Sequence, residues 1–67
     1  MVKINGEEEN LAGMNLAKCI EEHGYTTKWI VVEINEEIIP KEKYKDITIK
    51  DNDVIEVVSF VGGGWYG

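Results

Sequence analysis

One segment of this sequence has the periodicity of an amphipathic helix, and this limits the fold more than any other feature. The helical positions i, i+3, i+4 and i+7 are occupied by Leu16, Cys19, Ile20 and His23. Asn15 precedes them as an N-cap residue, and Gly24 follows as a left-handed stop. The pattern predicts one short helix over residues 15–23, and a single helix can cover only one face of a sheet.

The N-terminal segment has the signature of a β-hairpin. Val2 and Ile4 alternate with polar residues before Asn5-Gly6, a dipeptide that favours the two left-handed residues of a type I′ turn. The return arm, about residues 7–11, is acidic and poor in β-branched residues. This composition suits a short edge strand whose charges discourage pairing with another chain.

The middle of the chain predicts a central strand followed by a long connection. Residues 29–34 are nearly all β-branched or aromatic, and a short return arm follows at 37–39 after a polar break. The Lys-rich stretch 40–50 indicates a connection that contains one loose helical turn. Tyr44 and Ile47 are its isolated apolar anchors.

The last strand, residues 54–61, gives the strongest strand signal and follows a tight turn at 51–53. The predicted fold class is therefore α+β, with one helix packed across one face of a sheet of four to five strands. Alternation along the strands turns one set of side chains toward the helix: Val2, Ile4, Ile30, Val32, Ile34, Ile55 and Val57. The open face then receives Lys3, Glu33, Glu56, Val58 and Phe60.

Charge and size exclude several function classes. The chain has 67 residues and a net charge of −6, with seven Lys and no Arg. One small domain of this length has no room for a deep catalytic cleft, and its charge has the wrong sign for nucleic acid. Such a surface favours a basic protein face or simply keeps the chain soluble. The acidic N-terminus and short apolar runs predict a cytoplasmic protein without a membrane segment.

The polar residues do not form a catalytic or metal-binding constellation. The carboxylates at 7–9, 21–22 and 36–37 belong to adjacent Glu residues, whose side chains diverge, and the 51–53 turn lacks the other ligands of a calcium loop. Cys19, the sole cysteine, is expected in the core, and His23 in a cap or surface role. Trp29 and Tyr44 are expected as anchors at the edge of the core. We predict that the chain is not an enzyme and binds no metal or cofactor.

The C-terminal glycines are the most informative feature for function. Residues 62–64 are all Gly, which packing alone does not order, so we divide the chain into a domain at 1–61 and a tail at 62–67. A tail of this length reaches about 20 Å when extended and can enter a channel that excludes side chains. Val58 and Phe60 lie at its base as an exposed apolar patch, typical of partner contact. The alternative is a terminus without a role.

The whole pattern resembles the thiamine-biosynthesis sulfur-carrier family (ThiS), which has a β-grasp, ubiquitin-like fold with a mixed sheet. The resemblance covers about residues 1–64. Its carriers are Ile4-Asn5-Gly6, Val32-Glu33-Ile34-Asn35, Ile38-Ile39-Pro40, Tyr44, Asp51-Asn52-Asp53, Val54-Ile55-Glu56 and Phe60-Val61-Gly62-Gly63-Gly64.

The resemblance implies a carrier whose terminal carboxylate is activated by other proteins. A ubiquitin-activating-type adenylyltransferase uses ATP to adenylate the terminal glycine, here Gly64, and sulfur then converts it to a thiocarboxylate for thiazole formation. Gly62 and Gly63 thread the tail into partner active sites. Thiazole synthase is the implied docking partner, with Val58 and Phe60 in the contact.

Trp65-Tyr66-Gly67 depart from the family pattern, because they lock the Gly64 carboxylate in a peptide bond. Either a C-terminal peptidase removes them, or Gly67 itself is activated, or the chain is not a working carrier; we favour processing to Gly64. Two other functions stay open. One is a sulfur carrier for another pathway, such as molybdopterin or cysteine synthesis, and the other is a non-catalytic β-grasp protein-binding module.

Overall fold

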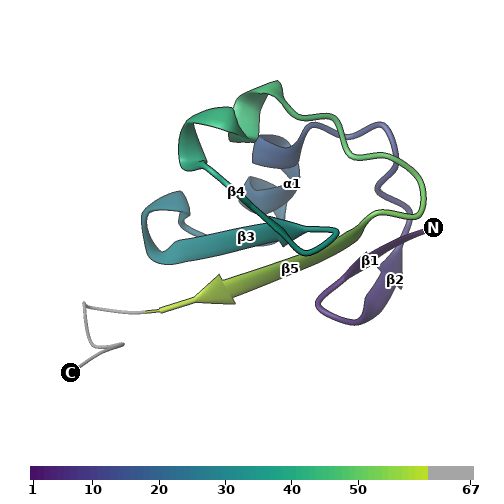
Figure 1. Ribbon diagram of the computed structural model, residues 1–67, viewed down its shortest axis with the longest axis horizontal. Helices are drawn as coiled ribbons and strands as arrows, with labels where there is room; N and C mark the ends of the chain where they lie inside the picture. Colours follow the sequence, from purple (N-terminus) through teal and green to yellow (C-terminus); the bar gives the residue numbers. More distant parts are fainter. Residues whose placement is uncertain (61–67) are drawn as a thin grey trace.

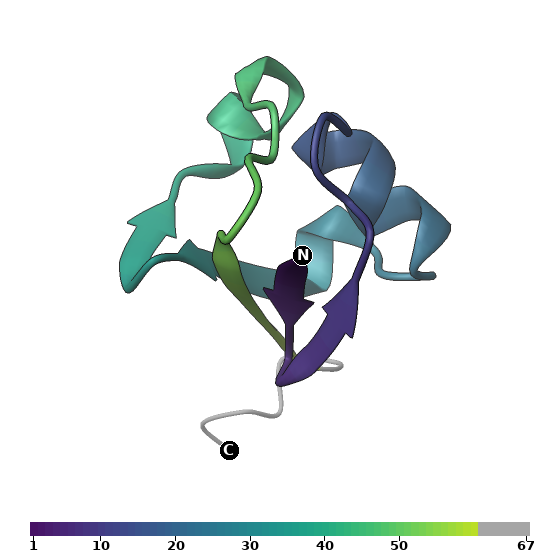
Figure 2. The same cartoon turned by 90° about the vertical axis from the view of Figure 1, so that its right-hand side faces the viewer.

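The computed structural model describes residues 1–60 and shows a five-stranded sheet with one α-helix on one face. The strand order is β2-β1-β5-β3-β4. The central pair of β1 and β5 is parallel, and the other pairs are antiparallel. Both views place α1 and the 3-10 helix η2 on the same side of the sheet (Figures 1 and 2). The predicted α+β class and mixed sheet are confirmed.

The N-terminal hairpin has the predicted turn but a shorter return arm. Strand β1 (Val2–Ile4) pairs with β2 (Glu7–Glu9) at the sheet edge, and Asn5 and Gly6 have φ of 51° and 85°, as a type I′ turn requires. The arm was expected to extend to Leu11, which is instead buried in the core. The chain leaves the sheet after β2 and turns this side chain inward.

Helix α1 (Leu16–Glu22) has the predicted N-terminal cap and C-terminal stop. The Asn15 side chain accepts a hydrogen bond from the Lys18 amide at 3.2 Å, and Gly24 has a φ of 82°. Leu16 is buried together with the other apolar residues of the predicted stripe except His23. His23 is the C-cap of the helix, and its side chain is 24% exposed, in keeping with the cap or surface role expected for it, because the helix ends there and the ring turns toward β2.

The second hairpin begins one residue later than predicted. Trp29 belongs to the 3-10 helix η1 (Thr27–Trp29), since its amide bonds the Thr26 carbonyl, and β3 (Ile30–Ile34) starts after it. The return arm is β4 (Glu37–Ile39), the other edge strand. Its turn resembles the first one in having two residues at positive φ, and here neither is Gly.

The long connection contributes more to the core than expected. The predicted loose helical turn is η2 (Lys41–Asp46), which buries Tyr44 to 3% exposure. Ile47 is half-buried, but Ile49, which the sequence pattern did not single out, is 1% exposed. The Ile49 backbone bonds Gly13 and Met14, and this second attachment turns its side chain inward.

Strand β5 (Val54–Ser59) lies at the centre of the sheet. Two asparagine side chains from the hairpin turns accept hydrogen bonds from its backbone amides where the neighbouring strands end. The Asn5 side-chain oxygen accepts from the Val57 amide at 2.8 Å, and the Asn35 oxygen accepts from the Val54 amide at 3.0 Å. The strand was expected to run to 61, but Phe60 lies outside it and residue 61 is beyond the described range.

The core lies between the sheet and the helical layer. All seven side chains predicted to face the helix are buried there. Helix α1, η2 and the connections complete the cluster with Leu11, Leu16, Cys19, Ile20, Tyr44 and Ile49. The opposite face of the sheet has no such layer in the described part of the chain (Figure 1).

Candidate functional site at the base of the C-terminal tail

The end of β5 is fixed to the start of β3. Ser59 pairs with Ile30 in the sheet, and the Phe60 amide donates to the Trp29 carbonyl at 2.8 Å. The Trp29 and Phe60 rings meet edge to face, with centroids 6.2 Å apart and planes at 87°. These contacts hold the last described residue at a defined place on the sheet, from which the tail continues.

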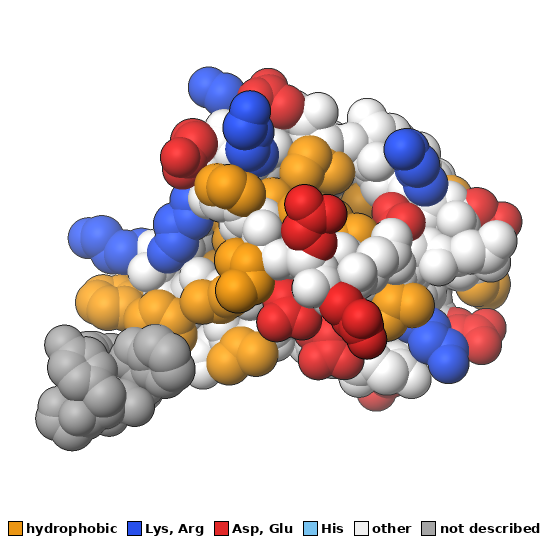
Figure 3. Space-filling view, viewed as in Figure 1, with side chains coloured by type: hydrophobic (Ala, Val, Ile, Leu, Met, Phe, Trp, Pro, Cys, Tyr) orange, Lys and Arg blue, Asp and Glu red, His pale blue; other side chains and the backbone are white. Residues whose placement is uncertain are grey.

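An apolar surface surrounds this point on the open face. We call it the tail-base patch, and it consists of Trp29, Val31, Ile38, Val58 and Phe60. Val58 is 56% exposed, as predicted, and lies directly across from half-buried Val31. Phe60 was expected to be exposed but is half-buried, because the edge of the Trp29 ring packs against it. Figure 3 shows hydrophobic side chains gathered at the lower left of the described part of the molecule.

Three members of the tail-base patch were missed as site residues. Ile38 is 64% exposed and pairs with Glu33, which places it on the open face diagonally from Val31. Trp29 was assigned to the core edge, but 38% of it is exposed. The apolar character of these residues is visible in the sequence, whereas the strand register that gathers them is not.

Charges of opposite sign border the tail-base patch. Glu33 and Glu56 face each other across β3 and β5, toward the middle of the sheet. On the other side, the Lys28 ammonium lies 6.0 Å from the Trp29 ring centroid, and the Lys41 ammonium donates to the Lys28 carbonyl at 3.2 Å. In Figure 3, a group of acidic side chains lies near the centre of this face, and lysines lie toward its left, top and right edges. The patch therefore has negative charges on one side and positive charges on the other, an arrangement that can orient a charged partner.

The glycines of the predicted reactive segment lie outside the described residues. Gly62 and Gly63, expected to thread into partner sites, and Gly64, expected to be modified, are not covered by the structure of residues 1–60. Their assigned roles stay predictions. What the structure contributes is the attachment point, because β5 leads from the sheet centre directly into this segment.

A second cluster joins the helix end to the edge strand. His23 places its Nδ1 atom 2.8 Å from the Cys19 carbonyl and its Nε2 atom 2.9 Å from the Glu9 carboxylate. Because both ring nitrogens meet acceptors, the geometry favours the doubly protonated ring. The Cys19 carbonyl foremost, and then the Glu9 carboxylate, raise the pKa of His23. The sequence pattern gave no partner carboxylate for His23, since Glu9 lies on another element.

This second cluster is structural. The Cys19 thiol lies 3.7 Å from His23 Nδ1, but Cys19 has no exposed surface. Burial raises its pKa, and the nearby Glu9 and Glu22 carboxylates add to the shift, so the unreactive thiol form prevails. The expectation that Cys19 belongs to the core is confirmed, as is the cap position of His23.

The acidic turn at 51–53 uses its carboxylates for local structure. Asp51 bonds the N-terminal amino group at 2.6 Å, which lowers its pKa. Asp53 accepts from the Asn35 side chain at 3.0 Å and from the Lys50 amide at 2.9 Å. Across residues 1–60, no three His, Cys, Asp or Glu side chains gather in a metal-binding arrangement. The helices of this same range are too short and polar to cross a bilayer.

Comparison with known proteins relates the whole chain to sulfur carriers. It is 39% identical to the sulfur carrier protein ThiS of Thermus thermophilus over 96% of this chain and 100% of that protein. It is also 42% identical, over 91% of its length, to a thiazole synthase of Paramagnetospirillum magneticum, of which it spans only 19%. A crystal structure of the thiamine biosynthesis protein ThiS from Geobacter metallireducens superposes with a TM-score of 0.73 at 25% identity, covering 94% of this chain and 97% of that chain.

The family model for ThiS matches residues 2–64. This range contains the β-grasp sheet, the tail-base patch and the three glycines that follow β5. With a full-length relative and a structural neighbour of the same family, the chain belongs to the ThiS family.

Proposed function

We propose that this ThiS-family chain is a sulfur carrier of thiamine biosynthesis and carries sulfur as a thiocarboxylate on Gly64. The observation that supports this most is the family match over residues 2–64, which includes the glycine run and ends at that residue. The full-length likeness to a protein named as a sulfur carrier supports the same function. The proposal places the chain as a protein cosubstrate in the cytoplasm, with no catalytic group of its own.

The proposed chemistry explains why a glycine carboxylate is needed. A carboxylate oxygen of Gly64 attacks the α-phosphorus of ATP, forming an acyl adenylate and releasing pyrophosphate. Hydrosulfide then attacks the acyl carbon, a C–S bond forms as the bond to AMP breaks, and loss of the S–H proton leaves the thiocarboxylate. Activation is required because a free carboxylate is a poor acyl donor. A ubiquitin-activating-type adenylyltransferase supplies ATP binding, so the carrier binds no cofactor.

The last three residues require one preceding step in this scheme. Trp65, Tyr66 and Gly67 follow Gly64, so a peptidase must hydrolyse the Gly64–Trp65 bond to release the carboxylate. The glycines before it have no side chains, which lets the tail enter a channel that excludes Cβ atoms. Gly62 and Gly63 have this threading role in the proposal.

Thiazole synthase is the proposed acceptor partner. Two relatives carry that name, from Paramagnetospirillum magneticum and Magnetococcus marinus, and the chain spans about a fifth of each. A segment like this chain is therefore part of the same polypeptide as a named thiazole synthase in those organisms. We propose that the tail-base patch, with Val58 and Phe60, docks on this enzyme, because it is apolar, exposed and adjacent to the tail.

Intact mass spectrometry tests the proposal directly. The full chain and a variant ending at Gly64 are incubated with the cognate activating enzyme, ATP and a sulfur source. We expect the variant to exchange one terminal oxygen for sulfur, and the full chain to do so only after loss of residues 65–67. Modification of the full chain at Gly67, or no modification of either form, would contradict the proposal.

The variant Gly63→Ala tests the proposed threading role of the glycines. Gly63 follows the last residue of β5, Ser59, by four positions in the sequence, so we expect circular dichroism and the unfolding midpoint to stay unchanged. Sulfur loading should fall, because the added Cβ obstructs a narrow channel. Loading at the normal rate would count against the threading role.

A further inference from the structure

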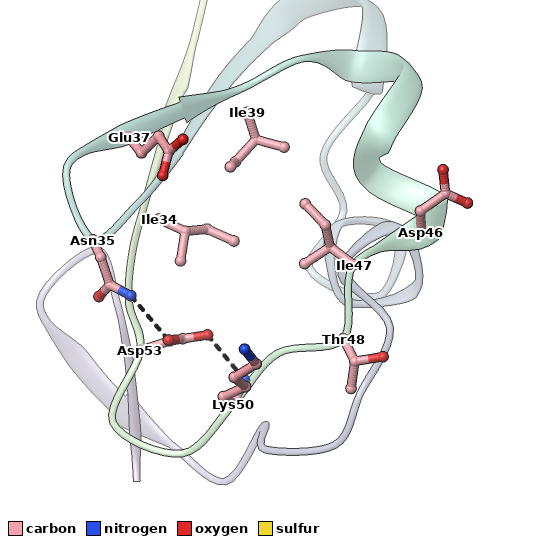
Figure 4. Close-up of a pocket in the computed structure, with 9 residues that line it drawn as sticks. All are labelled: Ile34, Asn35, Glu37, Ile39, Asp46, Ile47, Thr48, Lys50 and Asp53. Carbon is pink, nitrogen blue, oxygen red and sulfur yellow. Dashed lines mark hydrogen bonds between the residues drawn. The ribbon is translucent and has the colours of Figure 1, made fainter.

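A groove separate from the tail-base patch lies between the β3–β4 hairpin and the connection that follows η2. Its volume is about 490 Å³, a size typical of ligand pockets. Figure 4 shows the side chains that line it: Ile34, Asn35, Glu37, Ile39, Asp46, Ile47, Thr48, Lys50 and Asp53. None of them belongs to the tail-base patch.

The floor of the groove is apolar. Ile34 is 9% exposed, and Ile39 and Ile47 are half-buried against the core. In Figure 4, these three side chains converge from β3, β4 and the connection. They provide a hydrophobic surface for an aliphatic chain, which would otherwise stay in water.

The walls of the groove are predominantly acidic. Asp53 is already engaged, because it accepts from Asn35 and from the Lys50 amide. Glu37 and Asp46 have no ion-pair partner within residues 1–60. Figure 4 shows the Glu37 carboxylate reaching into the groove from the hairpin, while Asp46, at the opposite rim at the end of η2, points its carboxylate away from the groove. Lys50 supplies the single positive charge of the lining.

We propose that this groove binds an arginine side chain, together with an adjacent apolar side chain, from a partner protein. The aliphatic stem of arginine would cover the isoleucine floor, as such stems do on apolar surfaces. Its planar guanidinium matches a carboxylate better than a lysine ammonium does, and Glu37 is the carboxylate aimed inward. The chain has no Arg, so a second copy of it cannot be the source.

A dipeptide probe tests this inference on the full chain, independently of sulfur chemistry. N-acetyl-Leu-Arg amide is titrated while amide resonances are followed by nuclear magnetic resonance. The neutral isostere N-acetyl-Leu-citrulline amide is the control ligand. We expect shifts at Glu37, Ile39 and Ile47 with the arginine probe, a Kd of about 1–10 mM, and weaker binding at high salt.

Three variants are expected to weaken, strengthen and leave unchanged the binding of the arginine probe. Glu37→Gln should weaken arginine binding about two- to fivefold, the range for a solvent-accessible ion pair. Lys50→Gln should strengthen it, which a folding defect cannot imitate. Glu36→Gln removes the same charge one residue away, outside the lining, and should change binding little.

The proposal is overturned by any of three results. These are an absence of shifts in the groove, equal binding of the citrulline probe, and equal weakening by Glu36→Gln and Glu37→Gln. Sulfur loading of Gly64 is measured separately on the same variants. Because none of the described lining residues belongs to the tail-base patch, loss of arginine binding with normal loading separates this inference from the proposed function.

Discussion

The two faces of the central strand β5 use apolar side chains for different purposes. On the inner face, Ile55 and Val57 are 0% and 7% exposed and belong to the same core cluster as α1. On the open face of the same strand, Val58 is 56% exposed near the C-terminal end of β5. Adjacent residues thus contribute to folding or to partner contact according to the face they occupy. Substitutions on the two faces should therefore separate stability from binding.

The largest effect is expected on the inner face. Ile55→Ala removes a fully buried side chain and should lower the free energy of unfolding by about 2–5 kcal/mol, measured by urea denaturation. Because that loss can exceed the stability of so small a domain, Ile55→Val serves as a milder variant with an expected cost of about 0.5–1.5 kcal/mol. An unchanged urea midpoint in both variants would contradict a stabilising role for the inner face of β5.

The open face should show the reverse behaviour. Val58→Thr keeps the β-branched shape, so the free energy of unfolding should change by no more than about 0.5 kcal/mol. Affinity for the cognate thiazole synthase should fall about three- to tenfold, measured by calorimetry. Val54→Thr is the matched control, because Val54 is also exposed on β5, at the end away from the tail. Equal losses in both variants would contradict a docking surface at the tail base.

The contact between His23 and Glu9 at the edge of the core should make the free energy of unfolding depend on pH. The Cys19 carbonyl and the Glu9 carboxylate raise the pKa of His23 in the folded state. The stabilisation is therefore complete below the ordinary histidine pKa of about 6.5 and is lost as pH rises through the higher folded value. Its size is at most about 1 kcal/mol, because the pair is partly exposed.

Unfolding midpoints compared across this pH range provide the measurement. The wild-type curve should fall with rising pH relative to His23→Gln, which lacks the titrating ring. Parallel curves would show that the contact between α1 and β2 does not depend on protonation of His23.

The smallest effect is expected at the facing carboxylates of the open face. Glu33 and Glu56 are directly opposite across β3 and β5, and like charges in this position destabilise a sheet. Glu33→Gln should raise the free energy of unfolding by about 0.5 kcal/mol, more at low salt than at high salt. Glu36→Gln corrects for the change in net charge, and an equal gain from it would remove the pairwise explanation.

Local patterns predicted the elements of the fold well. The Asn5-Gly6 turn, the Asn15 cap and the Gly24 stop each depend on residues close in sequence, and all three are present. Errors occurred where distant segments meet. Ile49 is buried because its backbone attaches to Gly13 and Met14, a contact that no local periodicity indicates.

The candidate site shows the same division. Val58 was identified from the sequence, because alternation along one strand is enough to place it on the open face. Ile38 and Trp29 were not, since their places in the tail-base patch depend on the register of β4 and on the turn before β3. The groove beside Glu37 combines residues from both sides of η2 and was equally inaccessible to a local pattern.

By itself, the sequence determined the β-grasp elements, the inward-facing apolar set and the glycine segment, because short-range periodicity and turn preferences encode them. Only the tertiary structure decided the composition of the tail-base patch, the His23–Glu9 contact and the acidic groove. Each of these joins side chains from separate elements. Their distances are set by strand order and register, which arise when the entire core packs.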